Sequence, residues 1–489
     1  MGAKKDYIKI SKGLDIPLQG AAQCVLSDAR HILSYAVQPS DFVGLVPKLL
    51  VAEGDTVSAG SALFCDKNDP RILFPSPVKG VVKTILRGEK RRLLAVVVQR
   101  SDNSDTPSTA PTATDHSSSG FSREQLLSSG LWPLLRQRPF GTVALPDSKP
   151  KGIFISCFDS APLAPEVDFL LQGRESLFLS GLRLLTHLSD APIHLSFDLR
   201  KSKIEKAVEP LVLAPHSQFR IHHFSGPHPA GNVGTQIAHI DPINKGDVVW
   251  TLGPQEVAIL GHWALTGEYC PERRIAFAGP SAKHPQYYRL LAGAHMASLI
   301  HAQQFNPNYP GFDDDAAPRP LSSRFISGNV LSGSTIDSDG FLHFYDNLVT
   351  ALPEGDYYDF MGWLLPGLRK FSFSRTFLSG ILHPLLSRLP ISPASKSLLH
   401  NALSFDTNRH GDVRPFVLTG QFERLFPFDI YPLQLIKAAI IGDIELMENL
   451  GIYEVEPEDF ALCEFADASK TEIQSIIRNA LEQCRKEAL

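Results

Sequence analysis

Residues 101–119, SDNSDTPSTAPTATDHSSS, are the stretch that most constrains how this chain of 489 residues can fold. They include no leucine, isoleucine, valine, methionine or aromatic residue. Such a stretch buries too little apolar surface to offset the entropy that ordering would cost, so we expect a flexible linker or inserted loop at 101–120. The chain is then expected to fold as separate parts on either side of it, and its length suggests about three or four domains.

Residues 1–100 are predicted to form a small all-β domain, because short apolar runs such as 62–64 and 93–98 are separated by glycine and proline turns. Within it, residues 54–82 (GDTVSAGSALFCDKNDPRILFPSPVKGVV) have two glycine turns, a short strand, an Asp-Lys tip and a Pro-x-Pro return strand. This order is typical of the barrel-sandwich module that carries a lipoyl or biotinyl arm. It predicts that fold and puts Lys67 at the position of the modified lysine.

We nevertheless expect Lys67 to be unmodified. Seven residues separate Lys67 from Pro75, which makes the tip two residues longer than in lipoyl domains. Asp66 and Asn68 stand where a biotin site would have methionine. The segment from Asp66 to Arg71 is therefore predicted to be a presented contact loop. A lipoyl or biotinyl carrier stays the alternative.

Residues 121–320 alternate between strand and helix. Buried strands are predicted at 152–158, 193–198 and 219–224, and an amphipathic helix is predicted at 175–188. Alternation at this spacing indicates βαβ units and a parallel sheet. We therefore expect a Rossmann-like α/β domain here.

Two further parts follow. Residues 321–420 contain short strands and turns, and are predicted to form a compact β-rich, β-grasp-like module. Residues 421–489 have helical periodicity, with Ile473, Ile477 and Leu481 on one face of the last helix, and are predicted to form a helical domain. The whole chain is expected to be a multidomain protein that combines α/β and α+β parts.

The composition excludes several classes of protein. A formal net charge of −5 gives no indication of nucleic-acid binding. No apolar run reaches the roughly 18–20 residues that a membrane helix needs, and the N-terminus lacks the apolar core of a signal peptide, so we expect a cytoplasmic location. The six cysteines form no CxxC pair, which argues against a disulfide framework, a zinc knuckle or a complete iron–sulfur motif.

Three local features suggest chemistry without specifying a site. His222, His223 and His228 lie within seven residues, but no acidic or thiol ligand accompanies them at a standard spacing, and neighbouring strand residues face opposite sides. The loop 226–234 has glycines at 226, 231 and 234, yet it is not GxGxxG, so a tight packing loop and a ligand contact both stay open. Cys463 is predicted to be a buried core cysteine. No catalytic or metal motif is recognisable.

Collinear motifs recur along nearly the whole chain. They are IKISKGLDIPLQG at 8–20, DFVGLVPKLLVAEGDTVSAGSALFCDKNDP at 41–70, SPVKGVV at 76–82, FSGPHPAGNVGTQIAHIDP at 224–242, TGEYCPERRIAFAGP at 266–280, SRFISGNVLSG at 323–333, FERLFPFDIYPLQLIKAAIIGD at 422–443 and EPEDFALCEF at 456–465. Together these segments resemble the family of the A subunit of the Na+-translocating NADH:quinone oxidoreductase, the bacterial respiratory sodium pump.

The resemblance implies a peripheral subunit on the cytoplasmic face of the cell membrane, in a complex with five other subunits. That complex passes electrons from NADH to ubiquinone and drives Na+ outward, so the chain is expected to be part of an enzyme without a complete active site of its own. NADH, flavins and iron–sulfur centres are expected on partner subunits, and no cofactor is expected on this chain. The family's architecture is similar to the flavin-bearing subunit of respiratory complex I, whose glycine-rich flavin loop this chain lacks.

The family has been implicated in binding ubiquinone, and two loops supply suitable residue types. A quinone headgroup needs flat apolar walls and one or two hydrogen-bond donors. The candidate residues are Phe42, Gly44, Pro47 and Lys48 in DFVGLVPK, and Arg138, Pro139 and Phe140 in RQRPFG. Both loops could instead be interdomain packing, and the chain could be a scaffold that touches no quinone. A flavin-dependent NADH dehydrogenase acting alone is a further alternative.

Overall fold

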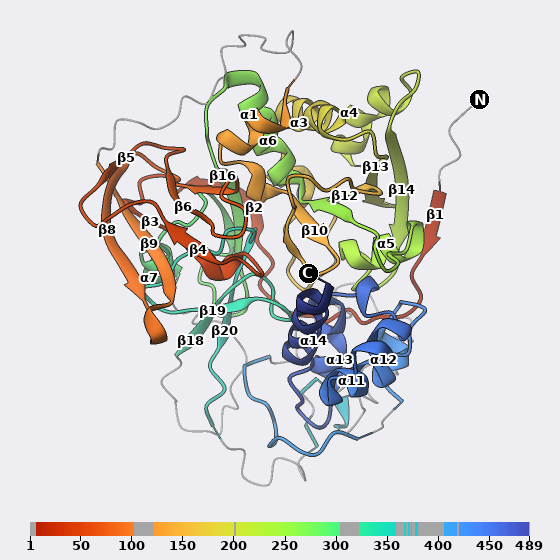
Figure 1. The fold of residues 1–489 in the computed structure, drawn as a ribbon. Coiled ribbons are helices and arrows are strands. Elements are labelled where there is room, and N and C mark those ends of the chain that lie inside the picture. Colours follow the sequence, from red (N-terminus) through yellow and green to blue (C-terminus); the bar gives the residue numbers. More distant parts are fainter. Residues whose placement is uncertain are drawn as a thin grey trace.

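The computed structural model describes residues 6–101, 121–199, 202–303, 322–357, 366–367, 370–371, 373, 377–379, 405–417 and 420–488. Figure 1 shows its ribbon, coloured along the sequence. Apart from its first residue, the predicted linker at 101–120 lies outside the described residues, as does most of 358–404 in the predicted β-grasp-like module.

The first part of the chain contains two small antiparallel sheets. One has the order β3 (Ser34–Val37), β9 (Leu93–Arg100), β8 (Gly80–Arg87), β5 (Thr56–Val57), and the other has the order β4 (Pro47–Leu49), β6 (Ala62–Asp66), β7 (Leu73–Pro75). The rings of Phe64 and Phe74 stack between neighbouring strands with centroids 4.9 Å apart. Val96 and Val98 of the first sheet belong to the same buried apolar cluster as these two rings, so the two sheets share a core and the predicted barrel-sandwich fold is confirmed.

A seven-stranded sheet forms the α/β part. Its order is β1 (Asp6–Lys9), β14 (Phe219–Ser225), β13 (Ile193–Asp198), β12 (Ile153–Ser156), β15 (Val249–Leu252), β10 (Arg136–Arg138), β11 (Thr142–Val143). The strands from β1 to β15 in this order are parallel, and β10 and β11 are antiparallel additions at one edge. The predicted Rossmann-like character is confirmed.

Helices α1 (Arg123–Ser128), α2 (Val167–Leu170), α3 (Glu175–Leu188), α4 (Lys203–Val212), α5 (Val233–Ile240) and α6 (Pro254–Thr266) accompany this sheet. Two glycines let α3 and α6 pack backbone against backbone. A Cβ on Gly181 would lie 1.9 Å from the Val257 carbonyl oxygen, and a Cβ on Gly261 would lie 1.8 Å from the Leu177 carbonyl oxygen. This contact fixes α6, whose first turn enters the site described below.

The N-terminal segment leaves the barrel-sandwich part and completes the two other sheets. Strand β1 pairs in parallel with β14, with Tyr7 opposite His223. Strand β2 (Gln23–Asp28) pairs in parallel with β17 (Gln286–Leu291). The apolar run at 7–10 therefore covers the edge of the α/β sheet, although the sequence suggested that it belongs to the first β domain.

The third sheet is mixed and has the order β19 (Ser334–Ile336), β18 (Ser323–Ser327), β20 (Leu348–Pro353), β16 (Glu272–Ala278), β17, β2. It joins strands of the predicted β-rich module to strands that precede residue 320, and α7 (Ala297–Gln303) follows β17 in the chain. The domain limits predicted at 100, 320 and 420 stay predictions. Strand pairing crosses the first two of these limits.

The C-terminal region is helical, as predicted. It consists of α10 (Phe422–Leu425), α11 (Pro432–Ile441), α12 (Ile444–Asn449), α13 (Ala461–Ala466) and α14 (Ile473–Ala488) around a core of their own. Cys463 is completely buried in that core, which confirms its prediction as a core cysteine. In Figure 1 these helices, in blue, lie below β10 and α5.

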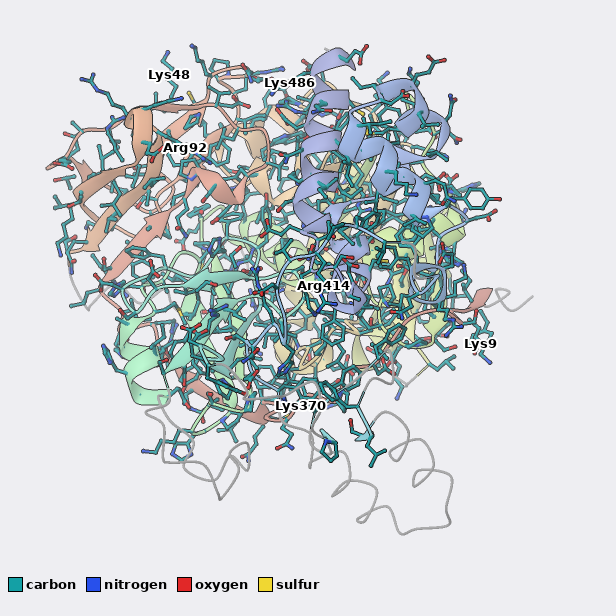
Figure 2. The ribbon with its side chains drawn as sticks, turned by 90° about the horizontal axis from the view of Figure 1, so that it is seen from below. Lys9, Lys48, Arg92, Lys370, Arg414 and Lys486 are labelled. Atoms are coloured by element: carbon teal, nitrogen blue, oxygen red, sulfur yellow. The ribbon has the colours of Figure 1, made fainter. Side chains whose placement is uncertain are left out.

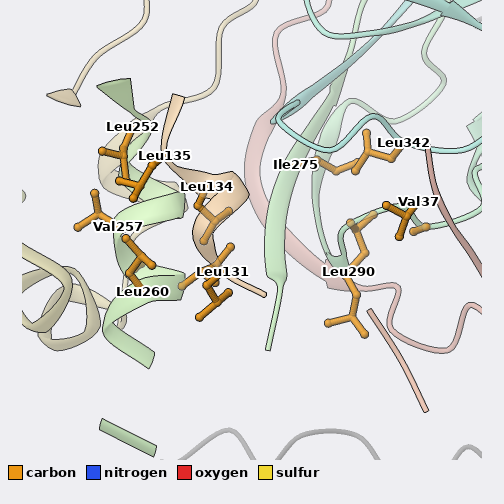
Figure 3. Close-up of a cluster of buried hydrophobic side chains, with 14 of the residues drawn as sticks. Val37, Leu131, Leu134, Leu135, Leu252, Val257, Leu260, Ile275, Leu290 and Leu342 are labelled. Atoms are coloured by element: carbon orange, nitrogen blue, oxygen red, sulfur yellow. The ribbon is translucent and has the colours of Figure 1, made fainter. Parts of the chain in front are cut away.

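One continuous apolar core joins the parts that precede the C-terminal helices. Figure 3 shows leucines of the segment 131–135 facing α6 residues such as Val257, while Leu290 of β17 lies close to Val37 of β3. Because the barrel-sandwich strands share this core with both larger sheets, these parts pack as one unit rather than as domains with separate cores. Within the described part of the chain, no helix is long and apolar enough to cross a membrane.

Candidate functional site

The seven-stranded sheet has a topological switch point between β12 and β15. From β12 the chain continues through β13 and β14 on one side, and β15 lies on the other side of β12. In open α/β sheets, ligands bind in the crevice beyond the carboxyl ends of the strands at such a point. A cavity of about 260 Å³ lies here, lined by residues that follow both strands.

Segments from distant parts of the chain close this switch-point cavity. Its lining includes Leu134 and Arg136, Phe158 and Asp159 after β12, His228 and Gly231 before α5, Leu252 at the end of β15, Gly253, Pro254 and Glu256 at the start of α6, Asn329 and Leu331, Tyr345 to Leu348, and Glu458 from the C-terminal region. Apolar walls thus alternate with polar groups. Such a combination is typical of small-molecule sites.

The N-terminus of α6 faces the cavity, and the chain's own carboxylate occupies it. The helix begins at Pro254, which has no N–H, and Glu256 lies in the first turn. A Cβ on Gly253 would lie only 2.2 Å from Glu256 Oε2, so this carboxylate folds back over the helix start. Glu256 also pairs with the buried Arg273 guanidinium at 2.7 Å. The anion that a helix N-terminus attracts is therefore already present.

The first turn of α5 likewise faces a carboxylate. A Cβ on Gly234 would lie 2.6 Å from Asp459 Oδ1 and 2.7 Å from Arg138 Nη1, so the turn can come this close only with glycine. Asp459 also accepts a hydrogen bond from the Glu456 N–H at 2.8 Å. Burial raises the pKa of Asp459 to about 7, against the opposing effect of the Arg138 charge. The C-terminal region thus supplies the counter-charge at the start of α5.

Arg138 holds a buried cluster of carboxylates together. Its side chain is 3% exposed, and it donates a hydrogen bond to Glu458 at 2.9 Å. It lies 3.4 Å from Glu456 and 3.5 Å from Asp459. Burial would raise the pKa of Glu456, but the charges of Arg138, Arg136 and Arg478 together outweigh it and lower that pKa. The Arg138 cluster therefore ties β10 to the turn Pro457–Phe460 of the C-terminal region.

Three titratable groups that line the cavity have pKa values shifted toward the neutral form. Burial raises the pKa of Asp346, and partial desolvation raises that of Asp159, although Asp159 is exposed to solvent. Burial lowers the pKa of His228 to about 4, so its imidazole is neutral near pH 7. His228 Nδ1 lies 3.1 Å from Ser160 Oγ. The protein around the cavity thus disfavours charge on these three groups.

Two of the residues predicted from the sequence lie directly behind the cavity wall. Phe42 is 3% exposed and packs against the ring of Tyr345, which lines the cavity, with centroids 5.8 Å apart. Arg138 lies behind Glu458, which lines the cavity from the other side. Neither side chain lines the cavity itself, but each contacts a residue that does: Phe42 packs against Tyr345, and Arg138 binds Glu458.

The other predicted residues lie along α14 or at the surface. The carbonyl oxygen of Phe140 accepts a hydrogen bond from Arg478 of α14 at 2.9 Å, and a Cβ on Gly44 would lie 3.0 Å from Arg485 Cζ. Both loops therefore contact the same helix.

The remaining three differ in exposure. Pro139 is buried, Pro47 is half-buried and Lys48 is exposed. Figure 2 shows Lys48 and Lys486 along the same edge of the molecule. The structure thus brings the two predicted loops together at α14, with the side chain of Lys48 open to solvent.

Lys67 is exposed at the tip between β6 and β7. Its N–H donates to the Val46 carbonyl oxygen at 2.8 Å. Arg71, on the same tip, pairs with Asp69 at 2.7 Å and with Asp147 at 2.6 Å. The tip is thus tied to the segment that precedes β12. That Lys67 is unmodified stays a prediction.

The histidines of β14 face opposite sides of the sheet, as predicted. His222 Nε2 lies 3.0 Å from His194 Nδ1, while His223 Nε2 lies 2.9 Å from Glu205 Oε1 of α4. Both imidazoles thus have protein partners. Among the residues that the structure describes, no group of three or more His, Cys, Asp or Glu side chains is arranged to hold a metal ion.

Sequence reasoning singled out His228 and Gly231, which line the cavity, but it missed the carboxylates and most apolar residues, because these come from segments that no motif links. One signal was present. The segments SCFDS at 156–160 and LGPQE at 252–256 each follow a buried strand and each contain a carboxylate. Had β12 and β15 been recognised as neighbours, their carboxyl ends would have indicated the switch point.

Two family models match the chain. The model described as the NqrA N-terminal barrel-sandwich hybrid domain matches residues 8–101, and the model described as the NqrA second alpha/beta domain matches residues 119–269. The cavity lies mainly on the second of these regions, where β12, β15 and the starts of α5 and α6 meet.

Curated relatives match over the full length. The A subunit of the Na(+)-translocating NADH-quinone reductase of Yersinia pestis is 33% identical over 98% of this chain and 100% of its own length. Proteins with the same name from Rhodopirellula baltica and Actinobacillus pleuropneumoniae serotype 5b are 33% and 34% identical, over 100% and 98% of this chain and all of their own lengths. By this full-length identity, the chain belongs to the NqrA family, the A subunits of the Na+-translocating NADH-quinone reductase.

Proposed function

We propose that this chain is a cofactor-free subunit of a membrane complex that passes electrons from NADH to ubiquinone and moves Na+ outward. The curated relatives are named as subunits of such a reductase. In this proposal the chain lies on the cytoplasmic face of the membrane, held by five other subunits that carry the NADH site, the flavins and the iron–sulfur centres. Its own roles are to bind the quinone headgroup and to organise assembly.

The residues around the cavity do not fit the phosphate of a flavin nucleotide. The carboxylates of Glu256 and Glu458 line it, together with the guanidinium of Arg136. The starts of α5 and α6, whose N–H groups would bind a phosphate, already face carboxylates of the chain. A dianionic phosphate would be repelled at each of these positions. This supports a chain that holds no flavin.

The cavity does suit a neutral ring that carries carbonyl oxygens. Its volume of about 260 Å³ is just below the roughly 300–1,000 Å³ of sites for drug-sized ligands, which favours one ring system over a dinucleotide. Leu134, Phe158 and Leu331 supply apolar contact. Asp159 and Asp346, whose pKa values are raised, can donate a hydrogen bond to a quinone carbonyl when protonated. This combination of apolar walls and protonatable carboxyl groups is the observation that carries the proposal.

Phe42 and Arg138 enter this proposal as positioning residues. Phe42 supports Tyr345, and Arg138 fixes Glu458. Direct contact between the quinone and the exposed parts of the loops 42–48 and 138–140 stays a prediction that the same experiment tests.

The test uses the assembled complex and a photoreactive quinone analogue. Peptide mapping should find label on the segments 156–160, 328–332 or 345–348 that surround the cavity. A second arm replaces Leu331 by Trp to fill the cavity, with the exposed Leu213→Trp as the control. The Leu331 variant should raise the KM for quinone about tenfold or more, as expected for a blocked pocket. NADH oxidation by an artificial acceptor that bypasses the quinone should not change in either variant.

The three possible label distributions have different meanings. Label in the cavity peptides supports the proposed site, whereas label confined to 42–48 or 138–140 would move the quinone to the α14 side. Label only on membrane subunits, with an unchanged KM in the Leu331 variant, would overturn the quinone proposal. The buried positions of Phe42 and Arg138 would then favour a purely structural scaffold.

A further inference from the structure

An apolar groove lies where α11 and α12 meet. It has a volume of about 440 Å³ and is lined by Ile440, Ile441, Leu446 and Leu450, with Lys437 beside them. Gly442, with φ of 71°, ends α11 in the left-handed conformation. The next residue then caps α12 with its carboxylate. The two short helices are thus fixed at an angle that leaves the groove open.

These apolar side chains are not needed for the core of the C-terminal region. Ile440, Ile441 and Leu446 are 50%, 71% and 41% exposed. On the inner faces of the same helices, Leu435 and Met447 are completely buried in the C-terminal core. Contiguous large apolar side chains that remain open to solvent mark an interaction surface. The helices therefore have one face for folding and one for a partner.

The charges around the groove decide the kind of partner. The groove lining includes Lys437, while Asp443 caps α12 and Glu445 and Glu448 lie on it, so carboxylates outnumber the cation on the two helices that form the groove. Glu448 is engaged by Lys245 at 2.7 Å, whereas the side chain of Glu445 is exposed. An anionic membrane surface would be repelled here, and a second copy of this chain would bring the same charge. Complementarity favours a basic segment.

We propose that this groove binds an amphipathic segment of a partner subunit, with apolar side chains at helical spacing and Lys or Arg beside them. In helix-in-groove binding an amphipathic helix lays its apolar face into a hydrophobic groove, and the open side chains of Ile440, Ile441 and Leu446 supply such a groove. The inference deepens the assembly role and rests on the proposed membership of a multisubunit complex. It does not depend on the quinone cavity.

The first test measures assembly of the full complex from tagged chains. Ile441→Asp places a charge in the apolar groove, and Leu213→Asp is a matched control because Leu213 is 65% exposed on α4's C-terminal side, away from the C-terminal helices. Recovery of the other subunits should fall about tenfold or more with Ile441→Asp and stay unchanged with Leu213→Asp. Glu445→Lys should also lower it, more at low salt than at high salt.

Folding and location of the contact are tested separately. Circular dichroism and thermal unfolding of the isolated chain should be the same for the Ile441 variant and the parent, because the side chain is exposed. For crosslinking, Ile441→Cys is made in a Cys24→Ser background, since the other five cysteines are buried. A thiol-to-amine crosslinker should join position 441 to a lysine-bearing apolar segment of one partner subunit.

Several results would overturn the inference. Equal recovery of partner subunits with Ile441→Asp and with Leu213→Asp is one. Concentration-dependent dimerisation of the isolated chain that Ile441→Asp abolishes would assign the groove to a second copy. Loss of binding to anionic phospholipid vesicles in the same variant would assign it to lipid. In each case the quinone labelling pattern is unaffected, so failure here is distinguishable from failure of the proposed function.

Discussion

Arg138 allows the sharpest test of whether a residue chosen for quinone contact has a structural role. Replacing it by Met keeps much of the side chain's apolar volume and removes the charge that lies among Glu456, Glu458 and Asp459. Glu456 and Asp459 are almost completely buried and would lose their closest cation. The variant therefore isolates the electrostatic part of the contact between β10 and the C-terminal region.

The expected magnitude follows from burial. Removing one partner of a buried ion pair costs about 3–5 kcal/mol, because a charge is left without compensation in a poorly solvated place. Part of this cost will be relieved as Asp459 takes up a proton, since burial has already raised its pKa to about 7. We therefore expect about 3 kcal/mol near pH 6, and a larger loss above pH 8, where Asp459 must ionise.

Hydrogen exchange is the suitable assay, because the chain is too large for one two-state unfolding transition. Amides of α13 and α14 should exchange about a hundredfold faster in Arg138→Met, as 1.36 kcal/mol corresponds to a factor of ten. Amides of β8 and β9 in the barrel-sandwich part should not change. Arg71→Met, which removes an exposed pair with Asp69 and Asp147, is the control and should leave α14 unaffected.

A compensating variant sharpens the interpretation. Combining Arg138→Met with Glu456→Gln and Asp459→Asn removes the orphaned charges and should restore most of the protection. Less than a threefold change in α14 exchange for Arg138→Met would refute the structural reasoning. If quinone labelling were lost without any change in exchange, Arg138 would instead be a direct quinone contact.

The remaining predictions concern protonation and modification. Folded Asp459 binds a proton more tightly than in the unfolded chain, so its contribution to stability is lost as pH rises from about 4 through about 7. Asp459→Asn should remove this loss, as measured by hydrogen exchange of α14 at a series of pH values. Burial, and then the charge of His222, lower the pKa of His194 to about 4, so its effect on the pH dependence of stability is opposite to that of Asp459. Its contribution is full above pH 6.5 and is lost as pH falls toward 4, so His194→Gln should flatten the acid limb of the stability profile. Intact-mass measurement should give the 53.8 kDa of the sequence, without an adduct on Lys67.

Features that depend on local sequence were predicted well. The helix expected at 175–188 is α3 (Glu175–Leu188), and the strand expected at 193–198 is β13 (Ile193–Asp198). Apolar side chains at the period of a helix or strand must reach one buried face, and this requirement acts within a few residues. The glycine and proline turns around the Lys67 tip indicated the barrel-sandwich fold in the same way.

Long-range pairing could not be predicted from one sequence. Tyr7 lies in β1, and its hydroxyl bonds with Ser225 on a strand 218 residues further along. The N-terminal segment has the same strand pattern whether it stays with the first β domain or crosses to another sheet. The crossing is decided by which edge is free when the core forms, and that information is spread over the whole chain.

The family, the classes of the parts and the burial of residues such as Cys463 could be inferred from residue order alone, since motifs and periodicity are local properties. Tertiary packing, in contrast, is what turns Phe42 and Arg138 inward, places carboxylates at the starts of α5 and α6, and leaves Ile440 and Ile441 open. The residue type alone determines a side chain's functional groups. Its solvent exposure, its counter-charge and its distance from a cavity depend on neighbours that only folding brings together.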